Sequence, residues 1–197
     1  MLPSKEGLVL IMTKYAGLEG TCLLVRENRN GLLNRFPTSF LDQILKLEET
    51  LKDDRDRRIA GSFETVPVFE AGEKGIFAAL WDFSAELELG LEADLRRIPI
   101  RQESIEISNY LDVNPYEISS NGVVLVAAKS SVAGDLLREF DRSQINADVI
   151  GSFNKGNDRV LLNRGARRFL TPVKRIEDEI KLRNSQKRTG KVADQPW

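Results

Sequence analysis

The sequence predicts an α/β protein with helices packed on a β-sheet, and three observations support this fold class. Residues 66–95 read as a strand, a turn at Gly72 and Gly75, a helix and a second strand, because the apolar period changes from two to about 3.6. Residues 7–12 and 123–128 are short apolar runs typical of buried strands. With 197 residues and 41% hydrophobic content, the chain is long enough for a sizeable core.

In the N-terminal part, the strand at residues 7–12 leads through a polar loop into a helix that Thr21 is expected to cap. Residues 39–58 carry apolar side chains at helical spacing and predict a long amphipathic helix. The charged end of this segment, residues 52–58, is typical of a solvated helix end rather than of a binding site.

Residues 66–95 form the centre of the predicted fold as a strand–helix–strand unit, with Gly90 in the position of a left-handed helix cap. The turn before the helix places backbone N–H groups where an anion could sit, and the loop at 17–21, with the Thr21 hydroxyl, could do the same. In both turns the alternative is a glycine turn or a capped helix without a ligand. The core-facing stripe of the helix is expected to contain Ile76, Phe77, Leu80, Phe83, Ser84 and Leu87.

The C-terminal part predicts further strands and helices. In order, these are a helix at 101–111, a strand at 123–128, a helix at 130–140 and strands at 147–153, 159–163 and 167–170, with 155–157 as a hairpin turn. Pro172 suits the first turn of a final helix. We therefore expect one domain at residues 1–183, followed by a polar tail, 184–197, that is predicted to be disordered.

The composition excludes several classes of function. Lys and Arg number 29 against 30 Asp and Glu, so the net charge of −1 gives no electrostatic case for nucleic-acid binding. The absence of His removes the commonest general base and metal ligand, and the one cysteine, Cys22, forms no intrachain disulfide or zinc site. No secretory signal or membrane-spanning apolar stretch is recognised, so a cytoplasmic protein is expected.

Three stretches in this order resemble the C-terminal domain of the AIR (aminoimidazole ribonucleotide) synthase related superfamily. They are TKYAGLEGTCLL at 13–24, the segment 75–107, and NPYEISSNGVVLVAA at 114–128 with VIGSFNKGNDRVLL at 149–162. The resemblance spans about residues 7–171 and is closest to the hydrogenase maturation factor branch.

The resemblance implies a mixed β-sheet with helices packed on it, in the closing half of a two-domain enzyme that uses ATP for phosphoryl transfer. The N-terminal domain of that family carries the Mg-ATP ligands and has no counterpart in these residues. We therefore expect a domain that is not catalytic alone and has no cofactor of its own, with ATP and Mg only if a partner supplies that domain. The expected partner is a separately encoded ATP-binding half, a related full-length enzyme or a second copy of this chain.

The same resemblance suggests the residues of a ligand site. In this branch the central turn reads His-Asp-x-Thr-Glu-Gly-Gly, whereas residues 69–75 read FEAGEKG, so only the glutamate and the last glycine match. No catalytic residue and no metal ligand can be assigned. The alternative is that these glycines and small residues persist because the backbone needs them in turns. The matching positions, which form the candidate ligand site, are Gly17, Glu19, Gly20, Thr21, Glu73, Gly75, Ser120 and Gly122.

Two other functions remain open. The first is a small enzyme or sensor that binds a phosphorylated metabolite through the 17–21 loop together with Glu70, Glu73 and Lys74. It requires the 17–21 loop, Glu73 and Ser120 to meet in one cleft. The second is a structural oligomer, which predicts an exposed apolar face on the sheet.

Overall fold

A computed structural model of the chain describes residues 7–63 and 67–172. Its centre is a seven-stranded sheet with the strand order β2-β4-β1-β5-β3-β6-β7. The strands are β1 (Leu8–Thr13), β2 (Val68–Glu70), β3 (Gly90–Asp94), β4 (Val124–Lys129), β5 (Ala147–Asn154), β6 (Arg159–Asn163) and β7 (Ala166–Phe169). The helices are α1 (Leu18–Glu27), α2 (Arg29–Leu32), α3 (Thr38–Leu47), α4 (Arg55–Ser62), α5 (Gly75–Glu86), α6 (Gln102–Leu111) and α7 (Ser130–Arg142), with 3-10 turns η1 (Glu48–Leu51) and η2 (Leu95–Arg97).

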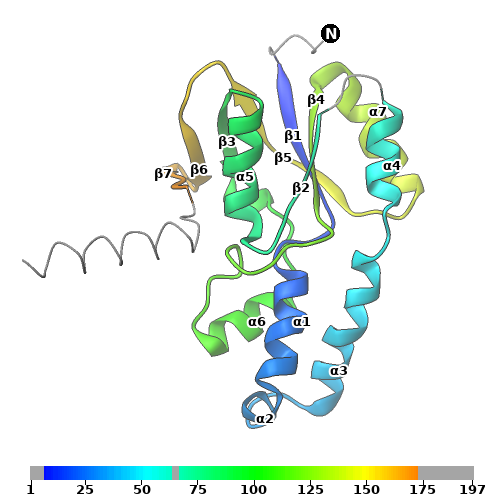
Figure 1. The fold of residues 1–197 in the computed structure, drawn as a ribbon, viewed down its shortest axis with the longest axis vertical. Helices are drawn as coiled ribbons and strands as arrows, with labels where there is room; N and C mark the ends of the chain where they lie inside the picture. The colour runs from blue at the N-terminus through cyan, green and yellow to red at the C-terminus, as the bar shows by residue number, and fades with distance from the viewer. Residues whose placement is uncertain (1–6, 64–66, 173–197) are drawn as a thin grey trace, which may run out of the picture.

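The sheet is mixed, because every neighbouring pair of strands is antiparallel except β3 and β6. Helix α5 lies over one face, and α4 and α7 lie over the other (Figure 1). Alternate residues of β1 therefore enter different cores: Leu10 and Met12 pack on the α5 side, whereas Ile11 packs on the α4–α7 side. The α/β class and the mixed sheet predicted from the sequence are confirmed.

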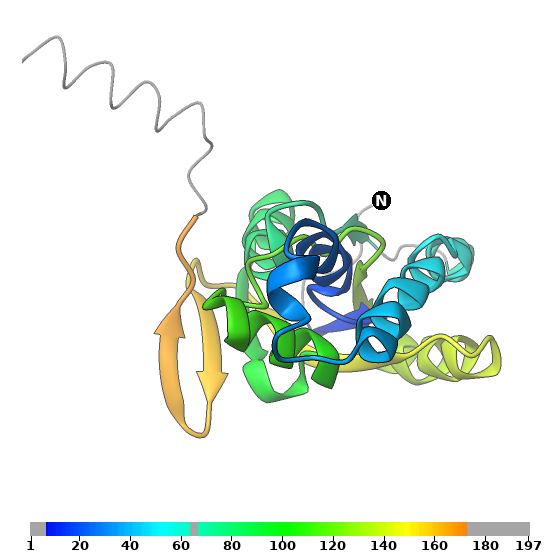
Figure 2. The ribbon, with the colours of Figure 1, turned by 90° about the horizontal axis from the view of Figure 1, so that it is seen from below.

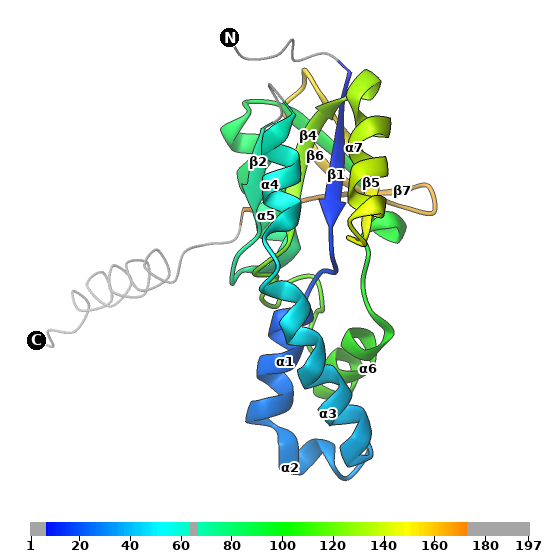
Figure 3. The same ribbon diagram turned by 90° about the vertical axis from the view of Figure 1, so that its right-hand side faces the viewer.

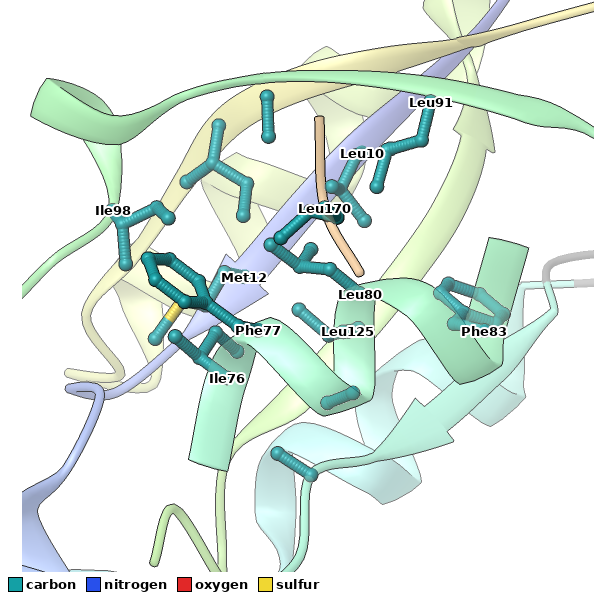
Figure 4. Packing of buried hydrophobic residues seen from close by; sticks show 14 of the residues in the cluster. Leu10, Met12, Ile76, Phe77, Leu80, Phe83, Leu91, Ile98, Leu125 and Leu170 are labelled. Atoms are coloured by element: carbon teal, nitrogen blue, oxygen red, sulfur yellow. The ribbon is translucent and has the colours of Figure 1, made fainter. Parts of the chain in front are cut away.

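The central strand–helix–strand unit is also present. Strands β2 and β3 run parallel with three strands between them, and α5 crosses from one to the other. The stripe predicted for this helix is buried from Ile76 to Ser84, and Figure 4 shows Ile76, Phe77 and Leu80 packed towards β1. This packing removes the α5 face of the sheet from solvent.

Helices α1, α2, α3 and α6 form a separate helical lobe beyond the end of the sheet (Figures 1 and 3). Its own core joins Leu18 and Val25 of α1 to Leu41 and Ile44 of α3 and to Ile107 of α6. The chain enters this lobe from the C-terminal end of β1. The junction between the lobe and the sheet therefore collects loops that are far apart in the sequence.

Several predicted boundaries were wrong. The segment 39–58 is not one helix, because it divides into α3, η1 and α4. Thr21 is not an N-cap: α1 begins at Leu18 after Gly17, and the Thr21 hydroxyl donates to the Gly17 carbonyl at 2.7 Å. Likewise, Gly90 begins β3, and the left-handed residue after α5 is Glu88, with φ of 53°.

The predicted hairpin at 155–157 was also wrong, since β5 and β6 do not pair. Strand β3 lies between them and pairs with both. The tight hairpin joins β6 to β7 through Arg164 and Gly165, which both have positive φ. This hairpin projects from the body of the molecule in Figure 2.

Two further expectations concern the ends and surfaces of the domain. Within the described ranges, no helix has the length and apolarity needed to cross a membrane.

The predicted final helix after Pro172 and the tail at 184–197 lie outside the described residues. Exposed large apolar side chains in the described part are scattered on α1, the α2 end, α6 and β7: Leu23, Leu33, Tyr110 and Phe169.

Candidate functional site

A cleft of about 400 Å³ opens between the outer face of α1 and the loop that precedes β4. Three of its lining residues are acidic, namely Glu19 and Glu27 of α1 and Glu73 from the turn before α5. The opposite wall includes Ile118, Ser119 and Asn121, so we refer to this site as the acidic cleft.

Glu19 is fixed across the acidic cleft by two side chains. The Ser119 hydroxyl and the Asn121 amide both donate to its Oε2 atom, the latter at 2.7 Å. Both bonds end on Oε2, and no residue in the described part of the chain donates to Oε1. A carboxylate held in this way can accept further hydrogen bonds or pair with a positive charge.

Three backbone donors of the 17–21 loop, the N–H groups of Gly17, Gly20 and Thr21, are engaged within the protein. The Gly20 N–H donates to the Ser119 carbonyl at 2.9 Å, and the Gly17 N–H donates to Ser120 Oγ at 2.9 Å. A Cβ at Gly20 would lie 2.7 Å from both Ile118 Cβ and the Ser119 nitrogen, so this glycine permits close approach of loop and helix. These contacts fasten the loop to residues 119–120, and they leave only the Leu18 and Glu19 N–H groups of the loop without an acceptor among the described residues.

In the turn before α5, backbone N–H groups also donate to an acceptor within the protein. The Ile76 and Phe77 N–H groups both donate to the Tyr116 carbonyl, at 2.9 and 3.3 Å. Gly75 has φ of +77°, and a Cβ there would lie 2.5 Å from that carbonyl oxygen. The N-terminus of α5 is therefore closed by a protein carbonyl, which occupies the place that the sequence offered to an anion.

The structure brings most of the predicted site residues together. Gly17, Glu19, Gly20, Thr21 and Ser120 form one contact cluster, and Glu73 lines the same cleft as Glu19. Gly75, the first residue of α5, packs against the Tyr116 carbonyl and does not line the cleft. Gly122 is separate, because its left-handed backbone packs against the Leu51 carbonyl of η1 and its own carbonyl accepts from Lys14.

Sequence reasoning missed Ser119 and Asn121, the two residues that hold Glu19. The only sequence signal near them is the Asn-Gly turn at 121–122, which predicts a bend but no contact with α1. Glu70, proposed for the sensor, pairs with Arg57 at 3.0 Å and does not line the acidic cleft.

A second buried polar group, which we call the lysine hub, lies where the lobe meets the sheet. Lys14 Nζ contacts Asp56 Oδ2 at 3.0 Å and donates to the carbonyls of Asp53 and Gly122 at 2.6 and 2.8 Å. Thr13 Oγ1 donates to the same Asp56 oxygen at 2.6 Å. All three ammonium protons of Lys14 therefore have partners, so this amine serves structure and is not available as a base or nucleophile.

Cys22 is buried between α1 and α3, where its Sγ donates to the Ile44 carbonyl at 3.5 Å. Burial, followed by the nearby Glu48 carboxylate, raises the pKa of this thiol to about 11. The thiolate is the reactive form, so we expect the native protein to react with an aromatic disulfide at about pH 8 at least about 100-fold more slowly than the unfolded chain. Stopped-flow absorbance with and without guanidinium measures both rates, and equal rates would contradict the burial of Cys22.

No protein-family model matches the chain. Among similar solved structures, E. coli HypE, a hydrogenase maturation protein, is 16% identical over 89% of this chain and 53% of its own, with a TM-score of 0.66. A thiamine-monophosphate kinase from Stenotrophomonas maltophilia is 14% identical over 85% of this chain and 52% of its own, with a TM-score of 0.56. T. maritima PurL complexed with ATP is 15% identical over 85% of this chain and 25% of its own, with a TM-score of 0.51.

HypE is also known in a complex with ATP and in a complex with HypF. The chain spans about half the length of the HypE and kinase chains that it matches. These likenesses show that the chain has the AIR synthase-like fold, as the resemblance in its sequence implied.

Proposed function

We propose that this chain is a partner-completing half of an ATP-dependent assembly of the AIR synthase and hydrogenase maturation type, and that it is not catalytic alone. The observation that carries the proposal is the match to about half of each HypE chain, by a domain whose sheet and lobe have their own cores. A nucleotide-binding half, in the same polypeptide or in another chain, would supply ATP and Mg.

The hydrogen bonds at the N-termini of α1 and α5 support the proposal that the partner binds ATP. In phosphate-binding sites, the free N–H groups of a helix N-terminus hold the anion. Here the Gly20 N–H of α1 bonds to Ser119, and the first two N–H groups after Gly75 in α5 bond to Tyr116. These N–H groups are not free to hold a phosphate, and we infer that ATP contacts reside mainly on the partner.

The acidic cleft would then provide groups for the non-nucleotide part of the reaction. The Oε1 atom of Glu19 and the side chain of Glu73 suit a substrate with amine, amide or hydroxyl groups. A cytoplasmic location, and assembly either with a separate half or with a second copy, belong to the same proposal.

A thermal-unfolding scan of the purified chain tests the proposal. We expect Mg-ATP, ADP and inorganic phosphate to leave the midpoint unchanged, because the chain alone does not bind them. Binding would be detectable, since a ligand at 100 times its Kd adds about 2.7 kcal/mol to the free energy of unfolding. Addition of an ATP-binding half of this fold from the same organism should raise the midpoint and restore a dependence on Mg-ATP. ATP hydrolysis at an enzyme-like rate by the chain alone would refute the proposal.

A second candidate is a stand-alone sensor of a small metabolite. Of the residues that it requires in one cleft, Glu19, Gly20 and Glu73 line the acidic cleft, whereas Gly17, Thr21 and Ser120 are buried and do not line it. It predicts that aminoimidazole ribonucleotide, a phosphorylated metabolite, raises the midpoint without any partner. Glu19→Gln should then remove the shift, whereas Glu139→Gln on α7, outside the cleft, should leave it unchanged.

A further inference from the structure

A second cavity, which we call the interlobe pocket, lies where the helical lobe meets the sheet. Its volume is about 410 Å³, within the usual range for small-molecule sites, and it shares no lining residue with the acidic cleft. It is lined by the loop after β1, the start of α1, the end of α3, η1 with its connection to α4, the residue before α6 and the loop before β5. These segments bring together side chains from both bodies of the fold.

The pocket has an apolar floor. Leu18 of α1 and Ile145 before β5 are buried, and Tyr15 and Leu47 are half-buried beside them. An apolar floor of this kind favours a ligand with a hydrocarbon or aromatic body over a free inorganic ion.

Arg101 is held rigidly at the rim. Its guanidinium lies over the Tyr15 ring at 5.3 Å, and its Nε and Nη2 atoms donate to the Glu103 carboxylate at 3.1 and 2.9 Å. Among the described contacts, Nη1 is left for a ligand. A guanidinium fixed on two sides loses little conformational freedom when it binds an anion.

Arg55 supplies a second cation on another wall. Its Nε and Nη2 atoms bind the Asp53 carboxylate at 2.8 and 2.6 Å, and this contact, together with the Arg55 backbone N–H, lowers the pKa of Asp53 to about 2. The remaining acidic lining residue, Glu49, pairs with Lys52 at 2.7 Å. The carboxylates that line the pocket are therefore neutralised by their own partners.

The charges at the pocket select the kind of anion. Lys14, Arg55 and Arg101 each have a carboxylate partner, so the ion pairs nearly cancel. The N-termini of α4 and α6 at the rim add a modest positive potential. This balance suits a single anionic group and disfavours a polyphosphate.

We propose that the interlobe pocket binds a small organic acid, with an apolar or aromatic body on the Leu18, Ile145 and Tyr15 floor and one carboxylate or phosphate group at Arg101. The Gln144 and Asn146 side chains at the wall provide further polar contacts. Because its walls come from both bodies, such a ligand stabilises the junction of lobe and sheet. This site is independent of the proposed partner and of the acidic cleft.

Four ring compounds of similar size separate charge from shape. Benzoate and phenyl phosphate carry the anion, benzamide is neutral and benzamidine is cationic. We expect amide-proton NMR titrations to about 10 mM to show binding of the two anions, with the largest shifts at Tyr15, Ile145 and Arg101, and none of benzamidine. The two anions also distinguish a carboxylate ligand from a phosphate ligand.

Three variants test the location. Arg101→Gln should weaken benzoate binding by about tenfold, and Thr50→Trp, which fills the pocket while keeping its charges, should abolish it. Arg142→Gln, at an exposed pair on α7, should have no effect. The proposal is overturned if none of the four compounds binds, if benzamidine binds as well as benzoate, or if benzoate binding survives both pocket variants in folded protein.

Discussion

Replacement of Asp56 by asparagine is expected to lower the free energy of unfolding by about 3–5 kcal/mol, because it leaves a buried ammonium without its counter-ion. Asp56 is 1% exposed and Lys14 is 8% exposed, so water cannot take over the lost interaction. Asparagine keeps the volume and one oxygen for the Thr13 hydroxyl. The change therefore removes mainly the charge that balances Lys14 Nζ at 3.0 Å.

Urea unfolding followed by far-UV circular dichroism measures this change. Asp54→Asn is the matched control, because the Asp54–Arg58 pair lies two residues away with side chains 70% and 68% exposed. That variant should stay within about 0.5 kcal/mol of the parent. A double variant, Lys14→Met with Asp56→Leu, should recover part of the loss, since it removes both buried charges but leaves the Asp53 and Gly122 carbonyls without their lysine donor. A loss below about 1 kcal/mol for Asp56→Asn would contradict the burial of the pair.

Asp56 also shows where sequence reasoning fails. It lies in the run 52–58, whose mixed charges predict a solvated helix end, and the six other charged positions of the run give no sign that Asp56 is buried. Its partner Lys14 is 42 residues away and stands at the end of a different element. Charge patterning records local helical faces, whereas this pair is created by the return of α4 to the end of β1.

The regular elements with a strong period were predictable. Strand β4 reads as a continuous apolar run because it is covered on both faces, and α5 shows its stripe because only one face meets the sheet. The pairing of strands was harder. Residues 155–157 look like a hairpin turn, but nothing local to them reveals that β3 inserts between β5 and β6.

The sequence predicted the 17–21 loop of the candidate site but not the residues that contact it. The glycines and glutamate of the 17–21 loop mark a turn that the backbone needs, so they stand out in the sequence. Ser119 and Asn121 do not, because their contact with Glu19 spans about 100 residues and depends on the path of the loop before β4. The interlobe pocket is likewise lined by residues that are far apart in the sequence, and no sequence motif predicts it.

Gly20→Ala is expected to lower the free energy of unfolding by about 1–3 kcal/mol, although alanine is the better helix former. Gly20 lies in the first turn of α1, and its Cβ would meet Ile118 Cβ and the Ser119 nitrogen at 2.7 Å. One of these atoms belongs to the backbone of the loop that carries the Glu19 partners. The clash must therefore either move α1 or displace that loop from the acidic cleft.

Gly61→Ala supplies the opposite expectation in the same protein. Gly61 is also helical, in α4, but a Cβ there would have no atom within 4 Å. Helix propensity then acts alone, and the variant should be more stable by about 0.5–1 kcal/mol. Urea unfolding measures the change in the free energy of unfolding for each variant. Opposite signs for the two changes separate the effect of packing at Gly20 from the effect of helix propensity. If both substitutions stabilise the protein, α1 does not approach the 118–119 loop closely, and the acidic cleft is wider than these contacts require.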